Sequence, residues 1–311
     1  MENGSVFLYY EISTSIAGLL RGVELREALE TVYAAGFRCL DFPISVFSRP
    51  EGSPLKSPGW RQWVMALKHR LDDMGFTVTQ AHASWEQAIG QDFSPEDPYP
   101  VYARTIEACR MLGCGKLVFH APLYFFPTKD RQTQIRIGQW NTQWFRKLSP
   151  TLKEFAVTAE LENTFDYGRV RQPGDPPFTY CSAEDMLELL QAIDDDCFAL
   201  CLDTGHANIA GLDPVQMIRA YGHRLEVLHL NDNLGYIQPV YEDLHLLPGH
   251  GNLDWPAIFA GLREMDYRGN FNLEPVGALP RLPFSIRVIQ LAAARETVRF
   301  LARNAGFPME P

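Results

Sequence analysis

Eight short apolar runs recur along the chain, separated by longer stretches with helical periodicity. The runs are rich in Val, Leu, Phe and Ile and do not alternate strictly with polar residues, which is typical of parallel strands covered by helices. Eight strand–helix units in 311 residues predict an α/β fold, a (β/α)8 barrel that forms one domain over residues 1–311. The predicted strands are 7–12, 37–42, 76–82, 116–120, 156–162, 198–203, 227–231 and 270–274.

Start and stop signals for helices fill the stretches between these runs. Gly36 stands where the first predicted helix should end, and Ser182 is a typical cap for a helix that runs to Ile193. A doubly wound sheet is the alternative fold, but no G-x-G-x-x-G follows any predicted strand. The other predicted helices span 60–74, 102–112 and 285–304, and two more begin at Asp213 and Asp254.

The charge and cysteine content restrict the possible partners and compartment. The chain has 28 Lys and Arg against 38 Asp and Glu, a formal net charge of −10, which argues against nucleic acid as the main partner. It begins without the pattern of a secretory signal, and no apolar stretch has the length of a membrane helix, so we expect a cytoplasmic protein that binds no membrane. We expect its cysteines to be reduced core thiols: Cys39, Cys109, Cys114, Cys181, Cys197 and Cys201.

Ionisable side chains gather at the carboxyl ends of the predicted strands. Six of the eight histidines lie at strand ends or in the loops that follow, and only His69 and His223 fall in helical segments. The carboxyl ends of barrel strands converge on one pocket, so these histidines should meet two glutamates and an aspartate there. Such a group is unfavourable in a buried pocket unless a cation is shared, and mixed imidazole and carboxylate ligands suit manganese, zinc, cobalt or iron(II). The sequence therefore predicts a divalent metal site.

Two glutamates on one predicted strand compete for the role of ligand. Glu160 and Glu162 are two residues apart, so their side chains point the same way. The neighbouring Asn163 places Glu162 nearer the strand end, so we expect Glu162 to be the primary ligand and Glu160 to be a supporting residue. Cys201 shares a strand face with Asp203 and should point into the barrel, with core packing as its expected role.

Five motifs in strand order resemble those of a known family. They lie within roughly residues 76–276, and together they resemble the xylose-isomerase-like TIM barrels, more narrowly the sugar phosphate isomerase/epimerase family. That family includes D-tagatose 3-epimerase and enzymes of myo-inositol catabolism. The motifs are ELENT (160–164), LDTGHA (202–207), HLND (229–232), HLLPGHGNLDW (245–255) and NLEP (272–275).

The resemblance implies a metal site and an activity. It implies that one divalent ion (Mn, Co, Mg or Zn) is held by Glu162, Asp203, His229 and Glu274, with the two glutamates as the acid/base pair. It also implies that His206 contacts substrate. The expected reaction is isomerisation or epimerisation of a sugar, sugar phosphate or related polyol ketone, by proton transfer through a metal-stabilised enediolate. Phosphorylated and free sugars remain equally open, and relatives of this kind commonly form homo-oligomers.

Endonuclease IV, a trinuclear zinc phosphodiesterase that acts on abasic DNA, shares the same superfamily and is the alternative. Its pattern requires further ligands, and this sequence can supply all of them, so additional zinc ions are possible. The net charge of −10 weakens this alternative. The residues that would bind substrate or additional metal are His82, His120, His206, Asp243 and His245. Aromatic side chains near strand ends are candidates to line the pocket: Phe42, Phe47, Trp85, Tyr124 and Phe125.

Overall fold

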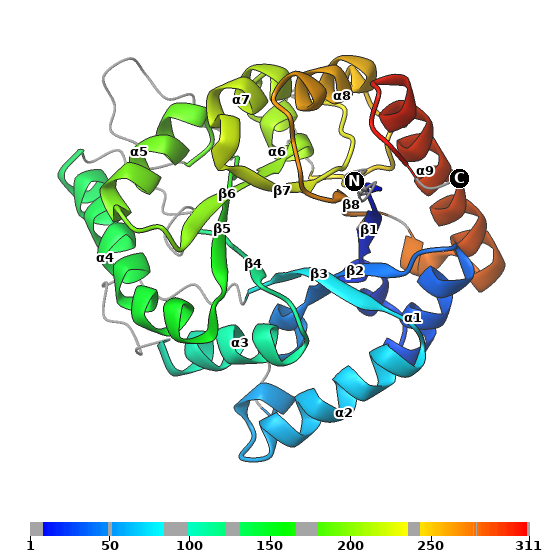
Figure 1. Ribbon diagram of the computed structural model, residues 1–311, viewed down its shortest axis with the longest axis horizontal. Helices are drawn as coiled ribbons and strands as arrows, with labels where there is room; N and C mark the ends of the chain where they lie inside the picture. Colours follow the sequence, from blue (N-terminus) through cyan, green and yellow to red (C-terminus); the bar gives the residue numbers. More distant parts are fainter. Residues whose placement is uncertain are drawn as a thin grey trace, which may run out of the picture.

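Eight parallel strands form the inner wall of a barrel in the computed structural model (Figure 1). The strands are hydrogen-bonded in the order β7-β6-β5-β4-β3-β2-β1-β8. The barrel closes just beyond β7, where Leu230 N–H donates to Asn272 O (2.7 Å) and Glu274 N–H donates to Leu230 O (3.1 Å). The bounds are β1 Ile12–Ser15, β2 Cys39–Pro43, β3 Thr77–His82, β4 Lys116–Phe119, β5 Thr158–Glu162, β6 Phe198–Asp203, β7 Leu225–His229 and β8 Phe271–Leu273.

The structure describes residues 9–48, 52–83, 99–121, 131–165, 180–235, 243–275, 277 and 279–309. Within these ranges, no helix combines the length and apolar character needed to cross a membrane. The six cysteines all lie in these ranges, and each is buried and free of disulfide bonds.

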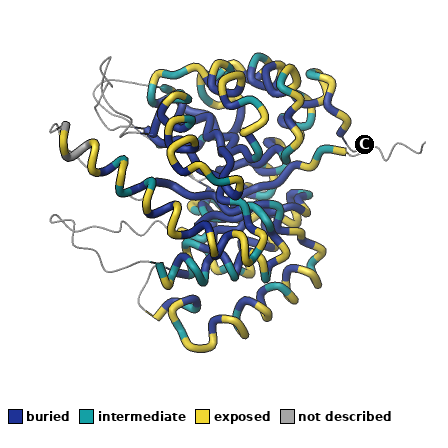
Figure 2. The backbone as a smooth tube through the Cα atoms, turned by 60° about the vertical axis from the view of Figure 1, so that its left-hand side comes forward, coloured by how far each residue is buried: buried dark blue, intermediate teal, exposed yellow. Residues whose placement is uncertain are grey.

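Helices surround the strands as an outer ring (Figure 1), and Figure 2 shows the buried backbone inside and exposed positions along the outer sides of the helices. Short 3-10 turns supplement them at η1 Leu19–Arg21, η2 Ile44–Phe47, η3 Pro54–Lys56, η4 Gly222–Arg224 and η5 Leu279–Arg281. The helices are α1 Leu25–Ala34, α2 Trp60–Asp73, α3 Tyr99–Met111, α4 Arg131–Phe155, α5 Ala183–Ile193, α6 Thr204–Ile209, α7 Pro214–Tyr221, α8 Trp255–Glu264 and α9 Phe284–Asn304. The predicted α/β barrel is confirmed.

The predicted helix starts are confirmed by their caps. The Ser182 hydroxyl accepts a hydrogen bond from the Asp185 N–H at the start of α5. The side chains of Asp213 and Asp254 accept equivalent bonds at the starts of α7 and α8, each with a proline in the first turn. These side chains satisfy backbone N–H groups that have no partner inside the helix.

Three elements differ from the sequence prediction. The first strand is Ile12–Ser15 rather than 7–12, because a polar Ser-Thr-Ser segment pairs with its neighbours: Ser13 aligns with Cys39 of β2 and Asn272 of β8. Residues 7 and 8 of the predicted strand lie outside the described residues. Helix α4 was not among the predicted helices, and α6 has only 6 residues, too few for a periodic pattern.

The barrel wall separates an apolar outer core from a more polar interior. Leu40 and Phe42 belong to the large hydrophobic cluster between the strands and the helices. Phe42 was predicted to line the pocket, but it packs in this core, where its ring stacks on that of Phe47 with 5.7 Å between the ring centroids. Val118, Cys201 and Val227 form a separate small cluster. Because side chains alternate along a strand, these three lie inside the barrel, as expected for Cys201.

Candidate metal centre

The strand ends bring the predicted site residues together. His82, Glu162, Asp203 and His229 are the last residues of β3, β5, β6 and β7, and Glu274 directly follows β8. In a parallel barrel all of these positions lie at the same end, where side chains from different strands converge. Each of these five residues is buried.

A central group of four residues matches the predicted metal ligands. Glu162, Asp203, His229 and Glu274 each offer one ligand atom, and these four atoms all lie within 4.8 Å of one another. The Nδ1 atom of His229 lies 2.9 Å from Glu162 Oε1 and 3.2 Å from Glu274 Oε2. Three carboxylates and one imidazole around a common point form a donor set that fits a divalent cation such as zinc or manganese.

The charges in this group depend on one another. Burial raises the pKa of Asp203 to about 6. Burial would also raise the pKa of Glu162, but His120 and His229 outweigh it and hold that pKa well below its usual value. In the same way, His229 and His245 overcome burial and lower the pKa of Glu274 to about 2. The glutamates are therefore ionised at neutral pH and available as ligands, and a bound cation would replace protonated imidazoles as their counter-charge.

Neighbouring side chains fix the position of Asp203. Its Oδ2 atom accepts a 2.6 Å hydrogen bond from Asn231 Nδ2, and its Oδ1 atom accepts one from the His206 N–H, also at 2.6 Å. The Asn163 side chain bonds the backbone N–H and C=O of Asp203. Gly205 leaves the space for this arrangement, since a Cβ there would lie 1.8 Å from Asn231 Oδ1. The LDTGH and HLND motifs thus act as one unit.

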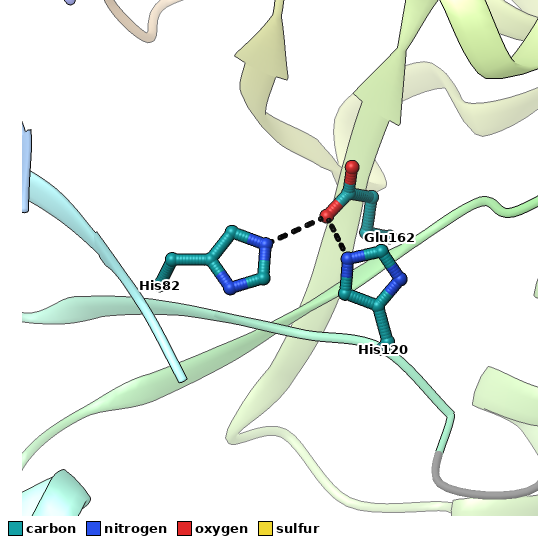
Figure 3. A group of neighbouring side chains, drawn as sticks. All are labelled: His82, His120 and Glu162. Carbon is teal, nitrogen blue, oxygen red and sulfur yellow. Dashed lines mark hydrogen bonds and ion pairs between the residues drawn. The ribbon is translucent and has the colours of Figure 1, made fainter. Parts of the chain in front are cut away.

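Two histidines extend the central group on one side. His82 Nε2 lies 3.2 Å and His120 Nε2 lies 3.0 Å from Glu162 Oε2, so both rings face the same carboxylate (Figure 3). The three ligand atoms lie within 4.8 Å of one another. Burial lowers the pKa of His120, which favours the neutral imidazole that a metal requires.

A third group adjoins the centre through His206. His206, Asp243 and His245 also bring their ligand atoms within 4.8 Å of one another. Asp243 Oδ2 lies 2.9 Å from His245 Nε2 and 3.6 Å from His206 Nε2. Despite burial, Asp243 and Glu274 raise the pKa of His245 to about 9. His206 was expected at a strand end or in a loop, but it lies in the first turn of α6, because Asp203 caps a short helix there.

Glu160 and Cys201 lie on the same strands, β5 and β6, as two residues of the central group. Glu160 is buried one layer below Glu162, and neither of its carboxylate oxygens has a hydrogen-bond partner among the described residues, so it does not support a ligand. Cys201 lies near Glu162 and His229. Burial raises the pKa of its thiol well above the usual value, which favours the protonated thiol.

The structure also adds residues that sequence reasoning gave no role. Asp232 accepts hydrogen bonds from Gly249 N–H (2.9 Å) and from the Trp255 indole N–H (2.8 Å), and so it holds the GHGNLDW loop beside the site. Asp41 of β2 is buried next to His229. An acidic residue inside an apolar run was the available signal for Asp41. The pocket candidates Trp85, Tyr124 and Phe125 lie outside the described residues.

One family model matches most of the chain, and two relatives match parts of it. The sequence model described as "Xylose isomerase-like TIM barrel" matches residues 29–304. An inosose dehydratase of Geobacillus kaustophilus is 34% identical over 100 residues, which cover 28% of this chain and 32% of that protein. A D-psicose 3-epimerase of Enterocloster bolteae is 28% identical over 161 residues, covering 52% of this chain and 46% of that protein. The chain thus matches between about a third and a half of the length of these relatives.

A solved structure extends the likeness in fold to nearly the whole chain. The crystal structure of the IOLI protein with a zinc atom superposes with a TM-score of 0.72 at 16% identity. The superposition covers 95% of this chain and 99% of that one. At this level of identity the likeness concerns the fold.

Proposed function

The chain belongs to the xylose isomerase-like TIM barrel family, as its strand-end motifs predict, and from this membership and the metal centre we propose that it is a divalent-metal-dependent isomerase or epimerase. Its substrate would be a sugar, a sugar phosphate or a related polyol ketone. The observation that carries the proposal is the buried group of Glu162, Asp203, His229 and Glu274, with four ligand atoms within 4.8 Å of one another.

These four residues would hold one Mn, Co, Mg or Zn ion. When bound, the ion would polarise a substrate carbonyl and stabilise the negative charge that forms when the neighbouring C–H proton leaves. Asn163 and Asn231 keep Asp203 in place for this role. The four side chains are buried, which strengthens the electrostatic interactions among them.

Glu162 and Glu274 are the proposed acid/base pair. They come from β5 and from the end of β8, and their carboxylates approach the same nitrogen of His229 from two strands. Both are ionised at neutral pH, the state in which a carboxylate accepts a proton. Delivery of the proton to the neighbouring carbon, with a hydroxyl proton moved between the two oxygens, would give isomerisation, and delivery to the opposite face of the original carbon by the second glutamate would give epimerisation.

Removal of a proton next to a carbonyl is also the first step in the dehydration of a polyol ketone. The relative named inosose dehydratase matches this chain at 34% identity over 100 residues. A substrate panel should therefore contain inosose beside the ketohexoses and their phosphates. Loss of water from inosose would assign the same site to a dehydratase.

The test combines metal content, a substrate panel and three glutamine substitutions. We expect about one divalent ion per chain by inductively coupled plasma mass spectrometry. Because positioned acid/base groups contribute roughly 10²–10⁴-fold, Glu162→Gln and Glu274→Gln should each reduce turnover by that factor. Glu160→Gln is the matched control, since Glu160 is equally buried on the same strand but lies outside the metal centre. Normal turnover in both site variants would refute the mechanism.

A second candidate function is favoured by the two adjoining groups. His82 and His120 with Glu162, and His206 with Asp243 and His245, could hold two further zinc ions, as in a trinuclear phosphodiesterase acting on abasic DNA. The net charge of −10 works against a DNA substrate. Close to three zinc ions per chain, with cleavage of an abasic-site oligonucleotide, would favour this function over sugar isomerisation.

A further inference from the structure

Asp41 lies on the side of His229 that faces away from the other ligands. It comes from β2 and is fully buried, and its Oδ2 atom lies 3.3 Å from His229 Nε2. The opposite ring nitrogen, Nδ1, is the one that faces Glu162 and Glu274. We propose that Asp41 is a positioning residue for His229, which holds the imidazole so that Nδ1 presents its electron pair to the metal. The inference rests on the metal site of the proposed function.

The surroundings of Asp41 require a hydrogen-bond acceptor at this position. Asn272 Nδ2 and Gln80 Nε2 lie 3.3 Å and 3.4 Å from the same Oδ2 atom and donate to it. Neither amide is free to turn around, because Asn272 Oδ1 accepts from the Ser13 hydroxyl and Gln80 Nε2 also donates to Leu228 O. Two amide N–H groups therefore donate to one carboxylate oxygen and fix its place in the barrel, and His229 Nε2 lies 3.3 Å from the same atom.

The strand register produces this convergence. The pairing of β2 with β3 shifts between Leu40 and Asp41, so that Asp41 aligns with Gln80 instead of with Thr79. A register shift of this kind changes the direction in which the neighbouring side chains point. Beyond the other edge of β2, Ser13 of β1 aligns with Asn272 of β8. The four polar side chains form one layer directly below the metal centre.

A histidine that binds metal through Nδ1 must carry its proton on Nε2. A carboxylate that accepts this proton's hydrogen bond selects the tautomer, fixes the ring and makes Nδ1 a better electron donor. Loss of such a partner typically weakens metal affinity about 10–100-fold. His229 Nε2 lies 3.3 Å from Asp41 Oδ2, an ion-pair distance, and this buried ring nitrogen has no hydrogen-bond partner among the described residues.

The test compares metal affinity in Asp41→Asn with that of the wild type and of a matched control. Asp41→Asn keeps the size of the side chain and one acceptor oxygen, and it removes the charge. Asp185→Asn is the control, because Asp185 is also a fully buried aspartate but lies in α5, outside the barrel. Zinc affinity is measured by competition with a chromogenic chelator, and thermal unfolding of each metal-free protein is recorded in parallel.

We expect Asp41→Asn to bind zinc about 10–100-fold more weakly and Asp185→Asn to bind it as the wild type does. Equal affinity in Asp41→Asn and the wild type, with or without a loss of thermal stability, overturns the positioning role and leaves the proposed function standing. A wild type that binds no divalent ion overturns both.

A second measurement does not depend on the variant folding. Histidine-selective ¹⁵N nuclear magnetic resonance of the zinc-loaded wild type reports which nitrogen of His229 carries the proton. The inference requires metal at Nδ1 and a proton at Nε2. The reverse assignment would overturn it.

Discussion

Replacing Gly205 with alanine should disrupt the support of Asp203, a proposed metal ligand. The new Cβ would lie 1.8 Å from Asn231 Oδ1 and 2.9 Å from Asn231 Cγ, so the asparagine must move. It would then lose its 2.6 Å hydrogen bond to the Asp203 carboxylate. A hydrogen bond to a charged group contributes about 1.5–3 kcal/mol, and overpacking a core adds about 1–3 kcal/mol. Gly205→Ala should therefore lower the free energy of unfolding by roughly 3–6 kcal/mol.

A double-mutant cycle with Asn231→Ala isolates the clash from the lost hydrogen bond. Asn231→Ala alone should lower the free energy of unfolding by about 1.5–3 kcal/mol, and it opens the space that the new Cβ of Gly205→Ala needs. Adding Gly205→Ala to this variant should then change stability by no more than about 1 kcal/mol, since alanine also favours the helix. The assay is urea unfolding of each protein, followed by circular dichroism.

The matched control for this cycle is Gly59→Ala. A Cβ at Gly59 would meet nothing closer than Gln62 Oε1 at 3.8 Å, so no clash arises, and the loss of stability should not exceed the roughly 1 kcal/mol by which alanine is disfavoured at the N-cap position of α2. If the effects of Gly205→Ala and Asn231→Ala simply add, the two residues are independent and the steric argument is refuted.

Two further predictions concern stability. Burial raises the pKa of Glu160 well above its usual value, so the wild type loses stability as pH rises from the unfolded-state pKa of this group to its folded-state pKa. In urea unfolding at a series of pH values, Glu160→Gln should therefore gain stability relative to the wild type as pH rises above the usual glutamate pKa, and a difference that stays constant with pH would contradict this reasoning. Ser182→Ala removes the cap that accepts from Asp185 N–H, and thermal unfolding should show a loss of about 1 kcal/mol, whereas Ser182→Asn, which can also cap, should lose little.

Most of the barrel could be predicted because its signals are local. Apolar runs mark the strands that helices cover on the outside, and caps such as Ser182 mark helix starts within a few residues. The convergence of the candidate site residues could be predicted because chain position in a parallel barrel translates directly into spatial position. Glu162, Asp203 and His229 end their strands, so they had to meet at one end of the barrel.

Support for the ligands could not be predicted in the same way, because it depends on which side chains touch. Asn231 and Gly205 lie on different segments, and their contact is visible only when β6 and β7 are placed side by side. The protonation states in the site likewise depend on which side chains meet in space. The pKa of Glu162 is held low by His120, which follows β4, and by His229 of β7.

The misplaced first strand and the overlooked Asp41 have a common physical origin. The prediction of strands relied on apolar residues, which holds for side chains that face the helices. Below the candidate metal centre the barrel interior is polar instead, and Ser13, Asp41, Gln80 and Asn272 are linked by hydrogen bonds there. Burying such a layer is favourable only when its hydrogen bonds are made, so each member constrains the others. A strand that contributes to this layer therefore looks polar in the sequence, and the acid that it places beside His229 looks like an interruption of an apolar run.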